Sequence, residues 1–344
     1  MGRNKEIKSL GELASSLPDY VYNADVIKSG IYPIDKILNG GLELGSFVQL
    51  IAESGFGKTT LALGLSYALC ESGFNVLYID SEKSVSNEIL ESTKVKSFLK
   101  EKFFLVKESE FSVVEDILDQ FIATGEINFV IIDSLAALIN GCFTNISGKK
   151  VKISITTNNT SYNSVPLTKF MDKYKSIAGS KKVCFVLINQ YRNKINMTSG
   201  AKEKAYGGKN TVYNCDVLIK IDKASLYKEK AFYELTKEVT TGIPLVLEIV
   251  KSNKKEPGTT VPAFLNFGKG IASRWNYIHE LIEKEVIRKN GSYYTLLYEG
   301  EEIKAQGIKN FVKELENKNL MQLEILESLI ADDLEIFIDM EDEI

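Results

Sequence analysis

The sequence predicts an α/β protein built on a central, mainly parallel β-sheet with helices on both faces. Between residues 31 and 270, apolar runs of strand length alternate with segments whose apolar residues recur at helical spacing. One apolar run, Phe47–Ala52, leads through a glycine-rich turn directly into a helical pattern, which is the context of a phosphate-binding loop. A second run, Asn128–Asp133, ends in a carboxylate. Together these observations favour a sheet whose carboxyl edge carries a ligand site.

Six apolar runs are the expected strands of this sheet. They are short and almost continuously apolar, which is typical of strands buried on both faces. The six runs are Phe47–Ala52, Asn75–Asp80, Phe103–Val106, Asn128–Asp133, Val183–Ile188 and Asp216–Asp222. Helices are expected at Thr59–Leu69 and Val113–Ala123, and later strands that can pair as a hairpin at Pro244–Val250 and Thr260–Phe267.

Smaller parts are expected on both sides of this core. Residues 1–30 are predicted to form a polar N-terminal arm, residues 271–330 a small α/β domain, and residues 331–344 an acidic tail. Within the core, residues 141–166 and 191–208 are rich in polar residues and are predicted to be two long loops. Loops of such length inside a compact domain are usually functional.

The composition is that of an ordinary globular protein, with 44% hydrophobic and 26% charged residues among 344. The net charge of −4 hides an asymmetry. The tail contains seven acidic residues and no basic one, whereas the second loop contains four basic residues and one acidic residue. This pattern suggests a polyanionic partner and a tail that competes with it. The alternative is that tail and loop are both simply solvated.

Histidine and cysteine usage excludes several kinds of site. His279 is the only histidine, so neither a histidine metal site nor a Ser-His-Asp triad can be built. The four cysteines have no metal-type spacing and are expected to be free thiols in a reducing compartment. The sequence shows no signal peptide and no apolar run of about 18 residues, so a cytoplasmic location without a membrane partner is expected.

The turn after Phe47–Ala52 is a P-loop. Its backbone N–H groups and the following helix N-terminus can point at phosphate oxygens, and its glycines let the chain curl closely. In such a loop the lysine reaches the β- and γ-phosphates and the next hydroxyl is a Mg²⁺ ligand. The residues assigned to ATP and Mg²⁺ are Glu53, Ser54, Gly55, Phe56, Gly57, Lys58, Thr59 and Thr60. One departure is Ala52, which stands where the motif usually begins with glycine.

Two carboxylates follow neighbouring strands at the same predicted edge. Asp133 ends a hydrophobic strand and is predicted to hold Mg²⁺ together with Thr59. Glu82 follows the strand that ends at Asp80, and a carboxylate there can polarise the attacking water, so Glu82 is the predicted general base. Core strands often end in Asp, however, and Glu82 could instead cap a helix near Val85.

Gln190 joins a buried strand to the second long loop. The apolar run Val183–Ile188 is followed by Asn189-Gln190 and then by the basic loop. An amide at a strand end can hydrogen-bond a γ-phosphate and lose that bond on hydrolysis. Gln190 is therefore the predicted sensor, joined directly to a loop that can touch something large.

Several segments together resemble the RecA family of recombinases, in its bacterial and phage UvsX-type branches. They occur in the family's order and cover about residues 29–320. In the core they are Ser29–Leu42, the P-loop, Asp80–Glu82, Ile131–Leu138, Asn189–Ile195, Gly207–Gly208 and Val250–Asn253. In the C-terminal part they are Phe267–Ile271, Tyr277–Val286 and Gly291–Gly307.

The resemblance implies a RecA-type ATPase core and a DNA-dependent ATPase that acts in recombination and DNA repair. Protomers would form a helical filament on single-stranded DNA, with ATP at each interface, and exchange strands with a homologous duplex. It also implies protomer contacts through the N-terminal arm, duplex binding by residues 271–330, and loader or single-strand-binding proteins as further partners.

The resemblance also assigns residues to roles. Lys58 and Thr59 match phosphate and Mg²⁺ positions, Asp133 the carboxylate at the metal, and Glu82 and Gln190 the catalytic base and the sensor. Lysines that reach the neighbour's ATP are matched by Lys251 and by Lys254 or Lys255. DNA-binding positions are Val165 in the first loop and Arg192, Lys194, Met197, Ser199, Lys202, Lys204, Gly207 and Gly208 in the second.

Some positions depart from the family pattern. Ser199 stands where an aromatic residue separates DNA bases, Val212 where a lysine is usual, and Ile89 near an adenine-stacking aromatic. Tyr213 does fit as an aromatic contact to a neighbour. An alanine at the first P-loop position, as at Ala52, also occurs in DnaB-like motors. One alternative is therefore a helicase or branch-migration motor of the DnaB or RadA type. Another is an ATP-binding regulatory module without recombination activity.

Overall fold

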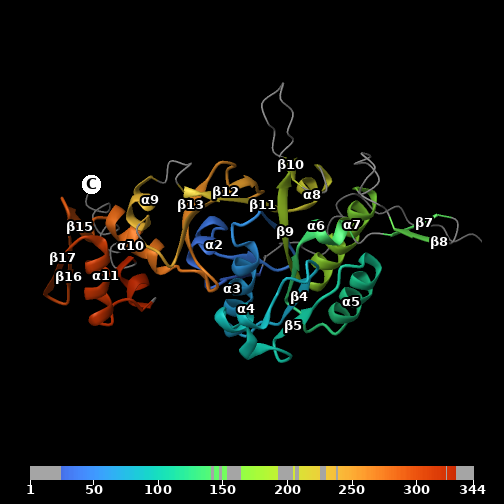
Figure 1. Cartoon of the computed structure of the whole chain (residues 1–344), viewed down its shortest axis with the longest axis horizontal. Helices are drawn as coiled ribbons and strands as arrows, with labels where there is room; N and C mark the ends of the chain where they lie inside the picture. The colour runs from blue at the N-terminus through green and yellow to red at the C-terminus, as the bar shows by residue number, and fades with distance from the viewer. Residues whose placement is uncertain are drawn as a thin grey trace, which may run out of the picture.

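The structure is a computed structural model that describes residues 25–140, 143–146, 149–152, 164–192, 204–205, 209–224, 230–237, 239–322 and 324–330. Its centre is a ten-stranded sheet with strand order β14-β13-β12-β11-β3-β9-β6-β4-β5, and β10 pairs with β9 beside this path (Figure 1). The predicted α/β fold with a mainly parallel sheet is confirmed.

The strands from β11 to β5 all run parallel. They are β3 (Phe47–Ala52), β4 (Val76–Asp80), β5 (Phe103–Val106), β6 (Phe129–Asp133), β9 (Cys184–Arg192) and β11 (Val217–Lys223). Every residue of β3, β4 and β6 is buried. Burial on both faces explains why these segments lack polar alternation, and all six predicted strands are present.

The other half of the sheet is antiparallel. It contains β12 (Gly242–Lys251), β13 (Thr260–Asn266) and β14 (Gly270–Ile271), each paired antiparallel with its neighbour. The predicted hairpin of two late strands is thus confirmed. Because β12 returns alongside β11, its last residue, Lys251, pairs with Leu218 at the amino end of the parallel strands.

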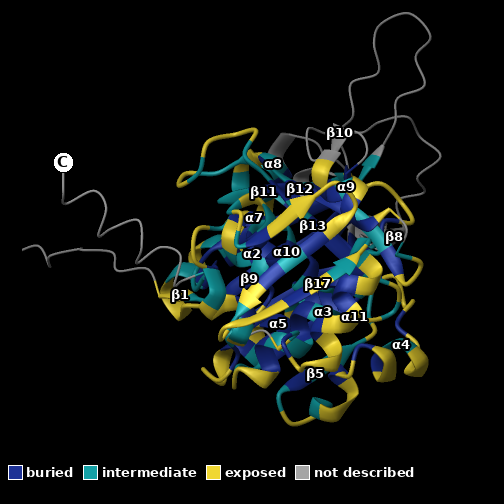
Figure 2. Ribbon diagram, turned by 90° about the vertical axis from the view of Figure 1, so that its left-hand side faces the viewer, coloured by how far each residue is buried: buried dark blue, intermediate teal, exposed yellow. Residues whose placement is uncertain are grey.

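Two apolar cores lie on the two faces of the sheet, because successive side chains of a strand point to opposite faces. On one face Leu50 of β3 packs in a cluster with Leu61 of α3 (Lys58–Glu71). On the other face Ile51 packs in a cluster with α5 (Phe111–Ala123) and α7 (Ser164–Lys181). Figure 2 shows the buried residues gathered in the strands between helices with exposed outer sides.

Both segments predicted to be long loops contain short strands among their described residues. In the first, β7 (Phe143–Ile146) and β8 (Lys149–Lys152) form an antiparallel pair, and α7 already begins at Ser164. In the second, β9 continues to Arg192, and β10 (Lys204–Ala205) pairs with it. These strands were not predicted because their largely polar sequences do not show the alternation of apolar and polar residues by which strands are recognised.

A third apolar cluster lies at the end of the molecule where α10 and α11 are drawn (Figure 1). It combines side chains of α10 (Arg274–Glu283) and α11 (Ile308–Asn317) with β15 (Ile287–Asn290), β16 (Tyr293–Tyr298) and β17 (Glu301–Gln306), an antiparallel sheet. Phe232 of α9 (Lys230–Thr236), a helix that the sequence did not predict, packs in the same cluster. The division at residue 271 stays a prediction.

The sequence favours one or two helices over Ile308–Leu326, and the structure has two helical segments in this region. The first, α11, ends at Asn317, and Asn319 adopts a left-handed conformation with φ 59°. Asn is one of the few residues that adopt this conformation readily, and it commonly terminates helices. A separate helical segment follows at residues 324–330.

The remaining short elements flank the main sheet. They are β1 (Val26–Ile27), α2 (Tyr32–Ile37), β2 (Leu42–Glu43), α4 (Asn87–Ser92), the 3₁₀ turn η1 (Val95–Phe98), α6 (Leu135–Asn140) and α8 (Lys209–Asn214). Among the described helices, none combines the length and the apolarity needed to cross a membrane.

Candidate nucleotide site at the carboxyl edge of the sheet

The P-loop joins the buried end of β3 to the first turn of α3. Gly55 and Gly57 have φ values of 84° and 68°, in the left-handed region that favours glycine. A Cβ added at Gly57 would lie 2.2 Å from Leu265 Cδ2. Ala52, by contrast, belongs to the strand and is not among the described residues with positive φ. The missing first glycine of the motif is therefore tolerated without backbone strain.

Lys58 lies folded over the loop that precedes it. Its Nζ donates to the carbonyl oxygen of Glu53 at 2.6 Å and to that of Ala52 at 3.3 Å. Burial lowers the pKa of Lys58, while the nearby carboxylates of Asp133, Glu82 and Glu53 oppose that shift. The ammonium group is thus held over the loop, where phosphate oxygens could replace the two carbonyl oxygens as hydrogen-bond acceptors.

Asp133 is only 2% exposed and lies at the end of β6 beside α3. Tyr78 Oη donates to Asp133 Oδ2 at 2.8 Å, and the Thr59 side chain is also hydrogen-bonded to this carboxylate. Burial raises the pKa of Asp133, and the hydrogen bonds from Thr59 and Tyr78 lower it. Tyr78 is a partner that the sequence prediction did not include.

The oxygen donors at this edge suit Mg²⁺. Thr59 and Asp133 touch through the hydrogen bond described above, so a hydroxyl and a carboxylate meet at one point. Mg²⁺ is commonly held by one or two carboxylates together with substrate phosphates and water. In the described part of the chain no three His, Cys, Asp or Glu residues form a metal cluster.

Asp80 shapes the turn that carries Glu82. Its side chain is fully buried and accepts hydrogen bonds from the backbone N–H groups of Ser84 at 3.1 Å and Val85 at 3.0 Å. The next helix, α4, is capped by Ser86, whose Oγ accepts from Ile89 N at 3.4 Å. The alternative role of Glu82 as a helix cap is therefore wrong, because Ser86 performs it.

Glu82 is the point where three strand ends meet. Its Oε1 accepts from Ser134 Oγ at 2.6 Å and from Gln190 Nε2 at 3.0 Å. The sheet register explains this convergence, because Asp80 pairs with Asp133 and Ala52 pairs with Gln190. The predicted base and the predicted sensor thus share one hydrogen bond.

Ser134 is a site residue to which the sequence analysis assigned no role. The peptide bond between Asp133 and Ser134 is cis. Besides donating to Glu82, Ser134 accepts at its carbonyl oxygen from Ser81 Oγ at 2.7 Å. A hydroxyl directly after the acidic end of a strand was the available signal, since that position projects over the same edge as Gln190.

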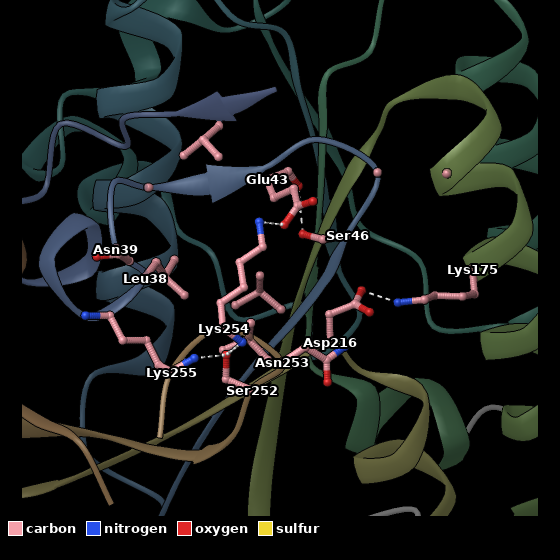
Figure 3. A pocket seen from close by; sticks show the side chains of 16 residues that line it. Leu38, Asn39, Glu43, Ser46, Lys175, Asp216, Ser252, Asn253, Lys254 and Lys255 are labelled. Carbon is pink, nitrogen blue, oxygen red and sulfur yellow. Dashed lines mark hydrogen bonds and ion pairs between the residues drawn. The ribbon is translucent and has the colours of Figure 1, made fainter. Parts of the chain in front are cut away.

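Lys251 and Lys254 do not lie at this edge in the same chain. Lys251 Nζ donates to the carbonyl oxygens of Tyr213 at 2.7 Å and Cys215 at 2.6 Å, at the end of α8. Lys254 pairs with Glu43 at 2.5 Å, across a pocket of about 560 Å³ at the amino edge of the sheet (Figure 3). Because these lysines and the P-loop lie at opposite edges of the sheet, the lysines could contact only the nucleotide of another protomer. That role stays a prediction.

The DNA-binding assignments are only partly within the described residues. Arg192 and Lys204 are cross-strand partners in the β9–β10 pair, and Val165 lies in the first turn of α7. The assigned residues Lys194, Met197, Ser199, Lys202, Gly207 and Gly208 lie outside the described residues. The N-terminal arm, apart from residues 25–30, and the acidic tail lie outside them as well.

Comparison with known proteins agrees with this architecture. Residues 8–272 match the family of the RecA N-terminal domain. The chain belongs to the RecA family. Membership implies a nucleotide-binding ATPase fold. The P-loop, Asp133 and Glu82 lie together at the carboxyl edge of the sheet.

The relatives of this RecA-family chain are distant, but the similarity covers most of the chain and more than two thirds of each relative. Protein RecA of Gloeothece citriformis is 26% identical over 313 residues, which cover 91% of this chain and 82% of that protein. Protein RecA of Synechocystis sp. is 28% identical, with 85% and 77% covered. DNA repair protein recA homolog 3, mitochondrial, of Arabidopsis thaliana is 25% identical, with 90% and 69% covered.

Proposed function

We propose that this chain is an ATP-dependent recombination protein that forms helical filaments on single-stranded DNA and promotes homologous pairing and strand exchange. Its relatives are named RecA and a DNA repair RecA homologue, which supports a role in recombination or repair. ATP and Mg²⁺ are the proposed cofactors, and single-stranded and homologous duplex DNA are the proposed partners.

The hydrogen bond between Gln190 and Glu82 carries this proposal. Gln190 stands two residues before Arg192, at which β9 pairs with Lys204 of β10. A change at the nucleotide edge can therefore pass along one short strand to the base of the proposed DNA-binding hairpin. Coupling between ATP and DNA requires one structural element whose conformational equilibrium both ligands shift, and β9 is the proposed element.

In the proposed reaction each polar side chain has a separate task. Lys58 and the P-loop N–H groups hold the phosphates, and Glu82 orients the attacking water and accepts its proton. Thr59 and Asp133 would hold Mg²⁺, which when bound neutralises charge on the β- and γ-phosphates. Gln190 would exchange its hydrogen bond to Glu82 for one to the γ-phosphate when ATP binds.

The direct test combines electron microscopy with a pairing assay. The protein is incubated with single-stranded DNA and a nonhydrolysable ATP analogue, and joint molecules are then scored with homologous and heterologous duplex. Helical filaments and homology-dependent joint molecules are expected. Closed rings with strand displacement that ignores homology would favour a DnaB- or RadA-type motor, and failure to bind single-stranded DNA in ATP would favour a regulatory module.

Arg192→Ala and Lys204→Ala are each expected to weaken single-stranded DNA binding equally for all sequences, because phosphate contacts carry no sequence information. Each lost contact should reduce the slope of log affinity against log salt by about 0.7. Fluorescence anisotropy over a salt series measures this slope. Lys173→Ala is the matched control, since Lys173 pairs with Asp119 on α5, and an unchanged slope in both test variants would contradict the assignment.

Deletion of residues 331–344 is expected to strengthen duplex DNA binding, because it removes seven negative charges from the chain. Like-charge repulsion between exposed groups is screened beyond about 8 Å at physiological salt. The gain should therefore be large at low salt and fade as salt rises. Identical salt titrations of the full-length and shortened chains would refute a competing role for the tail.

A further inference from the structure

Tyr78 places a hydroxyl group where the fold alone needs only a ring. Its side chain is fully buried and belongs to the apolar cluster under α3, with its ring 5.8 Å from that of Phe103. A phenylalanine would fill the same space. A buried hydroxyl is costly unless it is hydrogen-bonded, and the partner of this one is the Asp133 carboxylate at 2.8 Å.

The sheet register brings the two side chains together. Tyr78 on β4 pairs with Ile131 on β6, and Asp133 follows two residues later on the same face. Two residues along a strand span about 7 Å, which matches the reach of a tyrosine side chain toward the next turn of the pleat. The hydroxyl therefore meets the carboxylate from within the core, on the side away from solvent.

The hydrogen bond from Tyr78 holds one carboxylate oxygen of Asp133 and does not involve the other oxygen. Tyr78 donates to Oδ2. The second donor, the Thr59 hydroxyl, belongs to the P-loop and is itself a proposed Mg²⁺ ligand. If Thr59 turns toward the metal, Tyr78 is the side-chain donor that keeps the carboxylate in one orientation. The backbone of Asp133 is held separately, because its carbonyl oxygen accepts from Ser81 N at 2.8 Å.

We infer that Tyr78 is a positioning residue that sets the Asp133 carboxylate for Mg²⁺·nucleotide binding, an inference that rests on the proposed nucleotide function. It does not touch substrate and acts through Asp133. A tyrosine with a purely structural role would affect folding but would leave the metal dependence of nucleotide binding unchanged.

Tyr78→Phe separates these two roles. Fluorescent N-methylanthraniloyl-ADP is titrated with MgCl₂, and binding of the same nucleotide is measured in EDTA. The half-saturating Mg²⁺ concentration is expected to rise about 10-fold, the low end of what a hydrogen bond to a charged group contributes. Nucleotide affinity in EDTA should change by less than about twofold. Because the ring is retained, the melting temperature in EDTA should stay close to that of the control below.

Tyr174→Phe is the matched control. Tyr174 is also buried and donates to a carboxylate, Asp119 Oδ1 at 2.9 Å, but on the face covered by α5 and α7. This variant should leave the Mg²⁺ titration unchanged. In an Asp133→Asn background, Tyr78→Phe should cause no further change, because the partner charge is gone.

An unchanged Mg²⁺ half-saturation in Tyr78→Phe, or an equal rise in Tyr174→Phe, would overturn the inference while leaving the nucleotide site intact. Wild-type ADP binding without any Mg²⁺ dependence would likewise overturn the inference. A wild-type chain that binds no ADP, either with Mg²⁺ or in EDTA, would instead overturn the proposed nucleotide function, and this inference with it. A rise confined to Tyr78→Phe supports the positioning role.

Discussion

Lys58→Ala is expected to reduce ATP hydrolysis by about 10²–10³-fold, the usual effect of removing one preorganised charge donor from a transition state. The ammonium is held 2.6 Å from the Glu53 carbonyl, at the centre of the P-loop. Alanine fits the same helical position, so α3 should still form. Single-turnover hydrolysis at saturating ATP, with and without single-stranded DNA, measures the loss.

A lysine outside the site distinguishes a local from a general effect. Lys36 forms an exposed ion pair with Glu280 at 2.8 Å, and such pairs contribute about 0–1 kcal/mol to stability. Lys36→Ala should therefore hydrolyse ATP at nearly the normal rate. If Lys58→Ala kept more than a tenth of the wild-type rate at saturating ATP, Lys58 could not be the phosphate lysine of this site.

The framework of the site could be predicted from sequence because it depends on local pattern. Phe47–Ala52 is apolar throughout and leads into a glycine-rich turn, and both properties follow from the residues themselves. Glycines at positions 55 and 57 are required by the left-handed backbone, so their identity signals the turn. The order of strands then places Glu82, Asp133 and Gln190 at one edge.

The contacts between these residues could not be predicted, because they depend on register between strands. The pairing of Ala52 with Gln190 and of Asp80 with Asp133 decides which side chains meet. A shift of one residue would send Tyr78 to the opposite face. In the sequence, Tyr78 therefore looks like any other aromatic residue of a core strand, and nothing there indicates that its hydroxyl meets Asp133.

Polar hairpins and inserted helices were missed for a different reason. Arg192 and Lys204 pair through backbone groups at the end of β9, in a segment whose polar sequence shows no apolar alternation. Two apolar residues of α9, Phe232 and Leu235, are buried in the third apolar cluster. Two apolar residues are too few to reveal a helix by periodicity.

Gln190→Ala is expected to keep ATP binding but to abolish the gain in single-stranded DNA affinity that ATP produces. In the present state Gln190 Nε2 donates to Glu82, a hydrogen bond to a charged group of about 1.5–3 kcal/mol. A ligand can shift an equilibrium only by its differential affinity for the two states. Exchange of this bond for one to the γ-phosphate therefore limits the coupling to roughly 10–100-fold. Without the amide the ratio of DNA affinities with and without the ATP analogue should fall to about one.

Ser134→Ala is the variant that makes this result specific. Ser134 Oγ donates to the same oxygen of Glu82, at 2.6 Å, but Ser134 directly follows β6 and is not part of the β9–β10 hairpin. It should lower the hydrolysis rate through Glu82 and keep the ATP-dependent gain in DNA affinity. Intact coupling in Gln190→Ala would refute Gln190 as the sensor. Equal loss of coupling in both variants would show that Glu82, rather than the amide on β9, carries the signal to the hairpin.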